Sequence, residues 1–503
     1  MWIIVDNNNN EQEITVEDLN KLVEVRIEKL KDLQANNKNP FFVTKCEITN
    51  FSSDIKDTFV EDTELQVKIA GRIMSKRAMG KASFCDIQDS KGRIQLYVRA
   101  DMIGLDSYED FKKYDMGDIV YISGTVFKTH MGEVSVKATS VQLVSKSLIP
   151  LPEKWHGLKD VDLRYRQRSV DLIVNTEVKD TFIKRSKIIK AMRTYLESNG
   201  YLEVDTPMLN IVPGGAAAEP FETYHNALDM KLYLRISPEL YLKRLIIGGF
   251  DKVYEIGKNF RNEGISVKHN PEFTNMELYS AYDDYNDMMN VTEEMIQYIA
   301  NDVVGTEKIN YQGQDIDLSG KWKKITMIDS IKEVTGVDFN TILTNEDAIA
   351  AGKKLNLEVD STYKRGDVIN LAFEEKVEAT LIQPTFIMDY PVEVSPLTKR
   401  RQDKPELVER FELFIGGREY GNAYSELNDP IDQRYRFDDQ VAQREAGDKE
   451  ANMQDDEFLT ALEYGMPPTG GLGIGVDRLI MLLTDSASIR DVLFFPTMKP
   501  MNK

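Results

Sequence analysis

The chain has 503 residues with 83 acidic and 63 basic side chains, and its formal charge of -20 would ordinarily argue against a nucleic-acid partner. No apolar run approaches the roughly 20 residues of a membrane helix, and the apolar start is too short for a signal peptide, so we expect a cytoplasmic protein without a membrane partner. Cys46 and Cys85 are the only cysteines, and with four histidines they form no cluster with zinc-ligand spacing, so we expect oxygen atoms to hold any metal.

Residues 1–62 are expected to be an N-terminal helical extension. Leu19, Leu22, Val23, Ile27 and Leu30 recur at helical spacing, which predicts an amphipathic helix that packs on the body of the protein. Nothing in this segment indicates chemistry.

Residues 63–148 contain five short alternating runs separated by glycine-containing turns, which predicts a closed barrel of the OB type. Lysines and arginines outnumber acids seven to two between residues 72 and 99. The open face of such a barrel commonly binds single-stranded nucleic acid, and there Phe84 could stack a base while Gln95 reads its edge. A solvated sheet face explains the basic cluster equally well, and Phe84 could also be an ordinary core residue.

Residues 149–180 are interpreted as a linker and residues 181–503 as a larger domain. Pro207 cannot donate to a central β-ladder, so a strand around it would lie at an edge or an interface. Successive helical patterns within about 290–384 indicate a helical insertion, and strand character resumes at 384–397.

The segment 260–279 has the side chains that a nucleotide needs. Arg261 offers a planar fork for phosphate, Glu263 can accept from an exocyclic amine, and Phe273 offers a face for a purine. A second segment, 471–479, contains Arg478. Taken alone, Arg478 would be expected to form a salt bridge to Asp477 or to another acid.

Three segments, residues 200–209 (GYLEVDTPML), 260–279 and 471–479 (GLGIGVDRL), resemble motifs 1, 2 and 3 of the class II aminoacyl-tRNA synthetases, in chain order. The barrel resembles the anticodon-binding domain of the subgroup that charges lysine, aspartate and asparagine. The resemblance implies an α+β fold, with an OB barrel before a catalytic domain built on an antiparallel sheet flanked by helices. It also implies a homodimer formed through motif 1.

The resemblance implies that ATP activates an amino acid, which is then transferred to tRNA. Arg261 and Arg478 would be the catalytic residues, since the displacement at the α-phosphate needs alignment and charge neutralisation. Glu412 and Glu419 would lie on a hairpin and hold Mg²⁺, although two exposed acids would give the same pattern. The implied ATP-binding residues are Arg261, Glu263, His269, Asn270, Phe273, Glu412 and Arg478.

The amino acid implied by the resemblance is lysine, because paired carboxylates suit an ammonium group. Asn422 and Glu426 are four apart, which on a helical turn would place them side by side. The implied lysine-binding residues are Gly215, Glu239, Glu277, Tyr279, Asn422 and Glu426. The implied partner is the tRNA for lysine, whose anticodon would contact Arg77, Phe84, Gln95 and Glu133.

Three alternatives remain open from the sequence. An aspartate or asparagine ligase would share the motifs, and its aspartate form should show a pocket arginine, for which Arg418 is the nearest candidate. A synthetase-like protein that binds tRNA without catalysis would be expected to lack Arg261 or Arg478, and a paralogue that modifies proteins with lysine would lack the barrel. One departure is Glu219, which stands where bacterial lysine enzymes usually have a basic residue.

Overall fold

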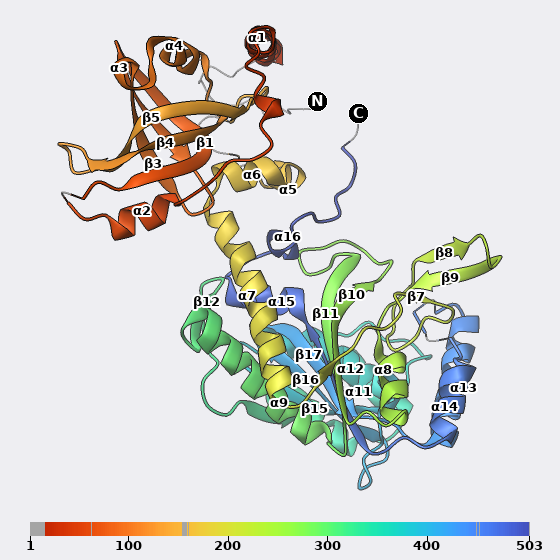
Figure 1. Ribbon diagram of the computed structural model, residues 1–503. Helices are drawn as coiled ribbons and strands as arrows, with labels where there is room; N and C mark the ends of the chain where they lie inside the picture. The colour runs from red at the N-terminus through yellow and green to blue at the C-terminus, as the bar shows by residue number, and fades with distance from the viewer. Residues whose placement is uncertain are drawn as a thin grey trace. The chain divides into compact units, whose positions relative to one another are not determined.

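The computed structural model describes residues 16–61, 63–152, 158, 160–448, 450–451 and 453–501. The chain divides into two compact units, Met1–Leu158 and Lys159–Lys503, each with its own hydrophobic core (Figure 1). The finer boundaries expected at residues 62, 148 and 180 stay predictions. None of the described helices is long and apolar enough to cross a membrane.

The first unit contains the predicted five-stranded barrel, with the strand order β1-β2-β3-β5-β4. Its side chains alternate between buried and partly exposed, because successive residues of a strand point to opposite faces. Helices α2, α3 and α4 belong to the same unit as the barrel. The bounds are β1 Gln66–Met79, β2 Ala82–Gln88, β3 Arg93–Arg99, β4 Ile119–Lys128, β5 Val134–Ser145, α2 Ser52–Thr58, α3 Ala100–Ile103 and α4 Leu105–Lys113.

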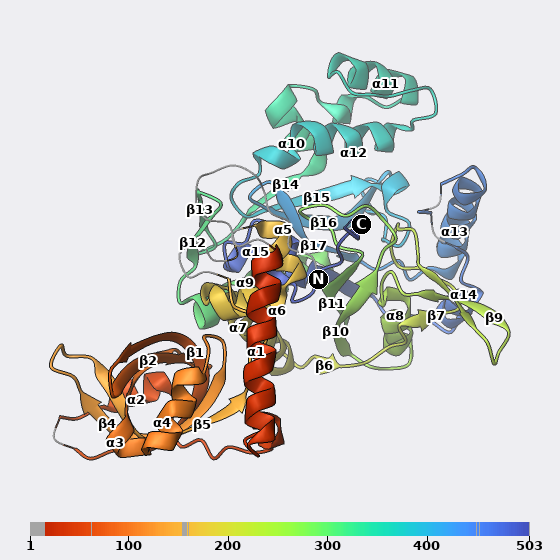
Figure 2. The same cartoon turned by 90° about the horizontal axis from the view of Figure 1, so that it is seen from above.

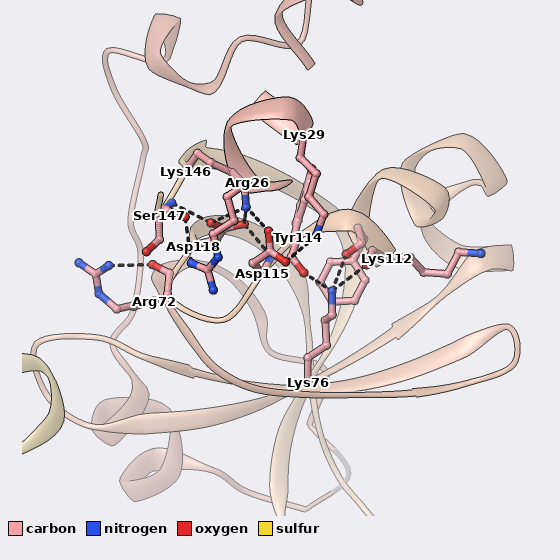
Figure 3. A network of polar contacts seen from close by, with 12 residues as sticks. Arg26, Lys29, Arg72, Lys76, Lys112, Tyr114, Asp115, Asp118, Lys146 and Ser147 are labelled. Carbon is pink, nitrogen blue, oxygen red and sulfur yellow. Dashed lines mark hydrogen bonds and ion pairs between the residues drawn. The ribbon is translucent and has the colours of Figure 1, made fainter. Parts of the chain in front are cut away.

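Helix α1 (Val16–Ala35) packs on this barrel, as predicted, and buries Leu19, Leu30 and Leu33. Leu22 was expected on the same face, but it is 42% exposed, so that part of the prediction is wrong. Polar contacts complete the docking of α1: Arg26 donates to the Ser147 carbonyl at 3.0 Å (Figure 3).

A partly buried ionic cluster joins α1 to the turn before β4 and the end of β5 (Figure 3). Lys146 Nζ lies 2.5 Å from Asp115 Oδ2 and 2.8 Å from Asp118 Oδ2, and Lys29 Nζ lies 2.6 Å from Asp115 Oδ1. Burial alone would raise the pKa of Asp115, but hydrogen bonds from Lys146 and Lys29 outweigh burial and lower it.

Two members of the basic cluster of residues 72–99 have structural contacts in this unit (Figure 3). Arg72 donates to the Gly117 carbonyl at 2.7 Å, and Lys76 donates to carbonyls at the end of α4, including that of Phe111 at 3.1 Å. Such contacts neutralise the negative end of a helix. The charge of Lys76 is therefore used within the barrel unit, which favours the structural explanation for this residue.

The second unit is built on an eight-stranded sheet with the order β14-β15-β16-β17-β18-β11-β10-β6. The six central strands are antiparallel, as predicted, whereas β14 and β6 pair in parallel at the two edges. Strand β6, which precedes Pro207, is indeed an edge strand. The bounds are β6 Leu202–Glu203, β10 Lys252–Phe260, β11 Glu272–Ala281, β14 Lys323–Thr326, β15 Thr385–Pro391, β16 Leu407–Ile415, β17 Arg418–Ser425 and β18 Thr469–Gly475.

Helices α7 (Glu177–Ser198), α9 (Tyr285–Ile299) and α15 (Val476–Leu483) pack with one face of this sheet in the largest core. The sheet contributes Met276, Leu278, Leu413, Leu472 and Ile474 to that core. The alternate residues of the same strands consequently point to the other face of the sheet.

Helices α10, α11 and α12 form a separate core against β15, within the range where a helical insertion was predicted (Figure 2). Their bounds are Met327–Thr335, Asn345–Lys354 and Arg365–Lys376. Helices α8, α13 and α14 surround a further cluster, and two small sheets complete the unit. The remaining bounds are α5 Val161–Arg166, α6 Arg168–Val174, α8 Glu239–Ile247, α13 Pro430–Glu445, α14 Asp456–Glu463, α16 Ile489–Val492, β7 Leu209–Asn210, β8 Glu222–His225, β9 Met230–Leu234, β12 Lys308–Tyr311 and β13 Gln314–Asp317.

Candidate active site

A cavity of about 420 Å³ opens on the face of the large sheet that lies opposite α7, α9 and α15. Its floor comes from β11, β16, β17 and β18. The structure brings every residue that the sequence assigned to ATP, lysine or metal to this one cavity, while their individual roles stay predictions. These residues are Gly215, Glu239, Arg261, Glu263, His269, Asn270, Phe273, Glu277, Tyr279, Glu412, Glu419, Asn422, Glu426 and Arg478.

Strand β11 supplies residues to the whole length of the cavity. Phe273, Asn275, Glu277 and Tyr279 alternate along it and share the cavity face, whereas Met276 and Leu278 are in the core. The aromatic end and the acidic end of the cavity are thus two ends of one strand.

Arg261 follows β10 and lies with its guanidinium 5.2 Å from the centre of the Phe273 ring. Burial lowers the pKa of Arg261, against the opposing effect of Glu263 and Glu419. Its buried Nε has no hydrogen-bond partner among the described residues. A buried donor without a partner is costly, so this arginine is suited to receive an anionic ligand.

His269 and Arg478 lie together near the aromatic end. His269 Nε2 lies 3.3 Å from Arg478 Nη2, and its other ring nitrogen lies 2.9 Å from the Ser266 hydroxyl. Burial and the charge of Arg478 lower the pKa of His269, which favours a neutral ring at pH 7.

Of the two partners that Arg478 alone suggested, Asp477 or another acid, the structure shows another acid, Glu419. Arg478 Nη1 donates to Glu419 Oε2 at 3.0 Å, whereas Asp477 receives Arg185 of α7 at 2.5 Å and the Thr274 backbone amide at 2.7 Å. Arg185 also donates to the Thr274 hydroxyl at 3.1 Å. Asp477 therefore ties α7, β11 and α15 together next to Phe273.

Glu412 and Glu419 lie on the predicted hairpin, on either side of the Gly416–Gly417 turn. A bulge in the β16–β17 pairing turns Glu419 to the face that Asn422 occupies, which a regular two-residue alternation would not allow. Burial raises the pKa of Glu412 to about 7. The described residues contain no group of three or more His, Cys, Asp or Glu side chains that could hold a metal ion.

Arg410 is a contributor that the sequence did not reveal. It donates to Asn422 Oδ1 at 3.0 Å and to Glu412 Oε1 at 2.6 Å, and its guanidinium lies 4.5 Å from the centre of the Tyr390 ring. Arg410 therefore fixes one residue assigned to lysine and one assigned to the metal.

At the acidic end, Glu277 accepts hydrogen bonds from Ser237 at 2.9 Å, from Asn275 at 3.1 Å and from Tyr279 at 3.3 Å. Burial raises its pKa to about 7, and the neighbouring Glu239 carboxylate adds to that rise. A carboxylate held in this way is ready to receive a cation.

Glu239 begins α8, and its carboxylate receives the Tyr424 hydroxyl at 2.8 Å and Lys243 Nζ at 2.7 Å. Lys243 also forms an ion pair with Glu426. The sequence did not predict a role for Lys243, because its pairing with Glu426 depends on the fold. Its spacing of four from Glu239 on a helix is the one signal in the sequence that indicates their contact.

Asn422 and Glu426 are not on a helical turn. Asn422 is in β17 and Glu426 follows that strand, so their spacing of four places them on one face at roughly 13 Å along the strand rather than side by side. Each serves a different part of the cavity. Arg418 is not in the acidic end either, because it donates to the Tyr311 hydroxyl at 2.7 Å.

Two glycines make room for these carboxylates. A Cβ on Gly471 would lie 1.9 Å from Glu426 Oε1. Gly215 has a φ of +85°, and a Cβ there would lie 2.8 Å from the Glu239 Cβ. Glycine is required at both positions for the loop and strand to approach so closely.

Glu219, in the same loop as Gly215, is half-buried, and its backbone carbonyl accepts a hydrogen bond from the Asn262 backbone amide at 2.7 Å.

In the barrel unit, three of the residues assigned to the anticodon occupy adjacent strands. Arg77 pairs with Phe84 across β1 and β2, and the Phe84 ring lies 4.9 Å from that of Tyr97 on β3. Gln95 accepts a hydrogen bond from Ser135 at 3.1 Å. Glu133, just before β5, is exposed and lies 3.1 Å from Lys56 Nζ.

Comparison with known proteins adds the family. Residues 160–499 match the family model of class II tRNA synthetases (D, K and N), and residues 67–144 match the OB-fold nucleic acid binding domain. The chain belongs to the class II tRNA synthetases. The OB-fold barrel and the α+β synthetase fold inferred from the motifs are thereby confirmed.

Curated relatives cover nearly the whole synthetase. A lysine–tRNA ligase of Thermoanaerobacter pseudethanolicus is 58% identical over 99% of this chain and 100% of its own length. Those of Clostridium tetani and Pelotomaculum thermopropionicum are 59% and 60% identical, over 98% and 96% of this chain and the same shares of their own.

Proposed function

We propose that this synthetase activates L-lysine with ATP to give lysyl-adenylate and then transfers lysine to the 3′ end of its tRNA in the cavity described above. The chain is a lysine–tRNA ligase, as its relatives at 58–60% identity over nearly their full length are. The observation that supports the location is β11, on which Phe273 and Glu277 face the same cavity.

The first step joins the lysine carboxylate to the α-phosphate and expels pyrophosphate. Phe273 would stack the adenine, and Arg261 would contact the α-phosphate and the carboxylate, two anions that repel each other until a cation lies between them. Arg478 and the neutral His269 would hold the outer phosphates. The reaction is then accelerated mainly by alignment and neutralisation, without a protein base.

Mg²⁺ is the proposed metal, since carboxylate oxygens are the hard ligands that it prefers. Glu412 and Glu419 fit this assignment, because both face the cavity, Glu412 beside Arg410 and Glu419 beside Arg478. When bound, Mg²⁺ would supply positive charge to the phosphates of ATP.

The acidic end favours lysine over aspartate or asparagine. Glu239, Glu277 and Glu426 are each at most 6% exposed, so the carboxylate of aspartate would meet like charges and neutral asparagine would leave them unbalanced. Arg410 and Arg261 lie elsewhere in the cavity, beside Glu412 and Phe273.

We further propose that the barrel binds the anticodon of the lysine tRNA through Arg77, Phe84, Gln95 and Glu133, and that the chain acts in the cytoplasm as a homodimer. Support for the dimer comes from motif 1 and the residues after it, where large apolar side chains are 43–58% exposed. Those side chains are Leu202, Met208, Leu209 and Ile211.

The test is exchange of pyrophosphate into ATP with lysine, aspartate or asparagine as the only amino acid. We expect exchange with lysine, and its loss in Arg261→Ala but not in Arg434→Ala, which changes an exposed arginine of α13. Exchange with aspartate or asparagine alone would contradict the proposed substrate, and no exchange with any of the three would favour a protein that binds tRNA without catalysis.

A further inference from the structure

Lys243 is a charged side chain without exposed surface, and the proposed reaction gives it no task. It lies on α8, one turn after Glu239, and its Nζ reaches carboxylates from two distant parts of the chain. The distance to Glu239 Oε1 is 2.7 Å, and Glu426 Oε2 forms the second ion pair. Aromatic rings of Tyr424 and Phe458 lie 5.6 Å and 5.9 Å from the same nitrogen.

The charges at the acidic end do not balance for lysine unless Lys243 is included. Three buried carboxylates, those of Glu239, Glu277 and Glu426, lie there, and free lysine has only two ammonium groups. A buried carboxylate without a cation is costly. Lys243 supplies the third positive charge from within the protein.

The hydrogen bonds show which oxygens remain for the substrate. Glu239 is occupied by Lys243 and Tyr424, and Glu277 accepts three donors. Glu426 Oε1, in contrast, is buried and has no hydrogen-bond partner among the described residues, and it lies against Gly471. Because Lys243 forms its ion pair with Glu426 Oε2, Oε1 is the oxygen of Glu426 that remains for an incoming ammonium.

The pKa directions agree with a pocket that lacks two cations before substrate binds. Burial raises the pKa of Glu277 to about 7 and raises that of Glu426 although Lys243 opposes the rise. The charged or titratable groups around the two carboxylates are Glu239 and Lys243 of α8, Tyr279 of β11, Tyr424 of β17 and Arg261.

We propose that Lys243 is a specificity-determining positioning residue, whose ammonium balances one of the three carboxylates so that the two remaining negative charges match the two ammonium groups of lysine. This inference rests on the proposed function. It assigns Lys243 an effect on lysine binding that acts through Glu239 and Glu426, without contact to the substrate.

The test compares KM for lysine and KM for ATP in pyrophosphate exchange. In Lys243→Met we expect KM for lysine to rise at least about tenfold, because Glu239 and Glu426 cannot both stay ionised and unpaired, while KM for ATP changes less than about twofold. Lys252→Met, which removes a lysine on β10 outside the cavity, is the matched control and should change neither value.

A double variant separates charge balance from a structural role. Lys243→Met with Glu239→Gln removes one positive and one negative charge together, so it should have a lower KM for lysine than either single variant. The proposal would be overturned if KM for lysine in the double variant were as high as in the more impaired single variant. If Lys243→Met does not fold, Lys243→Gln and Lys243→Arg replace it, and KM for lysine should be lower in the charged variant than in the neutral one.

The outcomes distinguish this inference from the proposed function. Absence of lysine-dependent exchange in the unmodified protein would remove both. Exchange in the unmodified protein, with KM for lysine unchanged in the neutral Lys243 variants, would overturn only the role of Lys243.

Discussion

Glu277 is one of the carboxylates whose ionisation should control lysine binding near neutral pH, together with Glu426, whose pKa burial also raises. The folded pKa of Glu277, about 7, lies above the ordinary value for glutamate, so the group is neutral at lower pH and ionises as the pH rises through 7. An ammonium ligand favours the ionised form. Lysine binding should therefore weaken as the pH falls below about 7, by up to about tenfold per pH unit for a single proton.

Calorimetry of lysine binding without ATP, between pH 5.5 and 8.5, checks this pH dependence. The dependence should become shallower in Glu277→Gln, which also binds lysine more weakly throughout. An affinity of the unmodified protein that is the same at pH 5.5 and pH 8 would show that Glu277 is already ionised there.

At the same scale, the sequence predicted residues whose roles follow from a local motif. Arg261, Phe273 and Glu277 could be found because a strand, a loop and a strand keep their order in the chain. Lys243 and Arg410 could not, since each acts through residues that only the fold brings near: Lys243 through Glu426, and Arg410 through the hairpin of β16 and β17.

Among the elements, α7 is tied to the aromatic end of the cavity through Arg185. Arg185 holds both Asp477 and Thr274, next to Phe273. We expect Arg185→Ala to raise KM for ATP by about tenfold, since β11 and α15 lose their common anchor, and to leave KM for lysine within about twofold. Lys184→Ala, on an exposed face of the same helix, should change neither value. Equal rises in both constants would mean that Arg185 supports the whole fold.

The turn before β4 is held to the end of β5 by buried ions (Figure 3). Asp118 is fully buried and receives Lys146 Nζ at 2.8 Å and the Ser147 amide at 2.8 Å. Asp118→Asn removes one of the two negative charges that balance the buried ammonium of Lys146. It should lower the free energy of unfolding of the barrel by about 3–5 kcal/mol. Chemical denaturation followed in the barrel unit measures it, with the exposed Asp57→Asn as the control. A loss below about 1 kcal/mol would mean that Asp115 alone holds Lys146.

The sequence predicted which segments form strands better than it predicted irregularities within a strand. The alternation within residues 63–148 predicted the barrel because each strand has one buried face. The bulge that turns Glu419 toward Asn422 has no comparable signal, because one extra residue in a strand leaves the apolar pattern nearly unchanged. The spacing of Asn422 and Glu426 is also compatible with a helix. Only the pairing of β17 shows that Asn422 lies in a strand and that Glu426 follows it.

At the scale of the whole molecule, the two units divide the proposed work, since the barrel contains the residues proposed to bind the anticodon and the second unit contains the cavity. A change on the barrel face should thus affect tRNA and spare amino-acid activation. Phe84→Ala removes a surface for base stacking worth about 1–3 kcal/mol, so kcat/KM for tRNA in aminoacylation should fall about ten- to a hundredfold. Pyrophosphate exchange with lysine, which needs no tRNA, should keep its rate.

Phe42→Ala is the matched control, because Phe42 is 81% exposed in the same unit but lies outside β1, β2 and β3. It should change neither reaction. If Phe84→Ala reduced exchange as strongly as aminoacylation, the barrel would have to influence the cavity of the second unit, and the division of work between the units would be wrong. If it reduced neither, Phe84 would be a residue of barrel packing through Tyr97, and the anticodon would have to bind by other side chains.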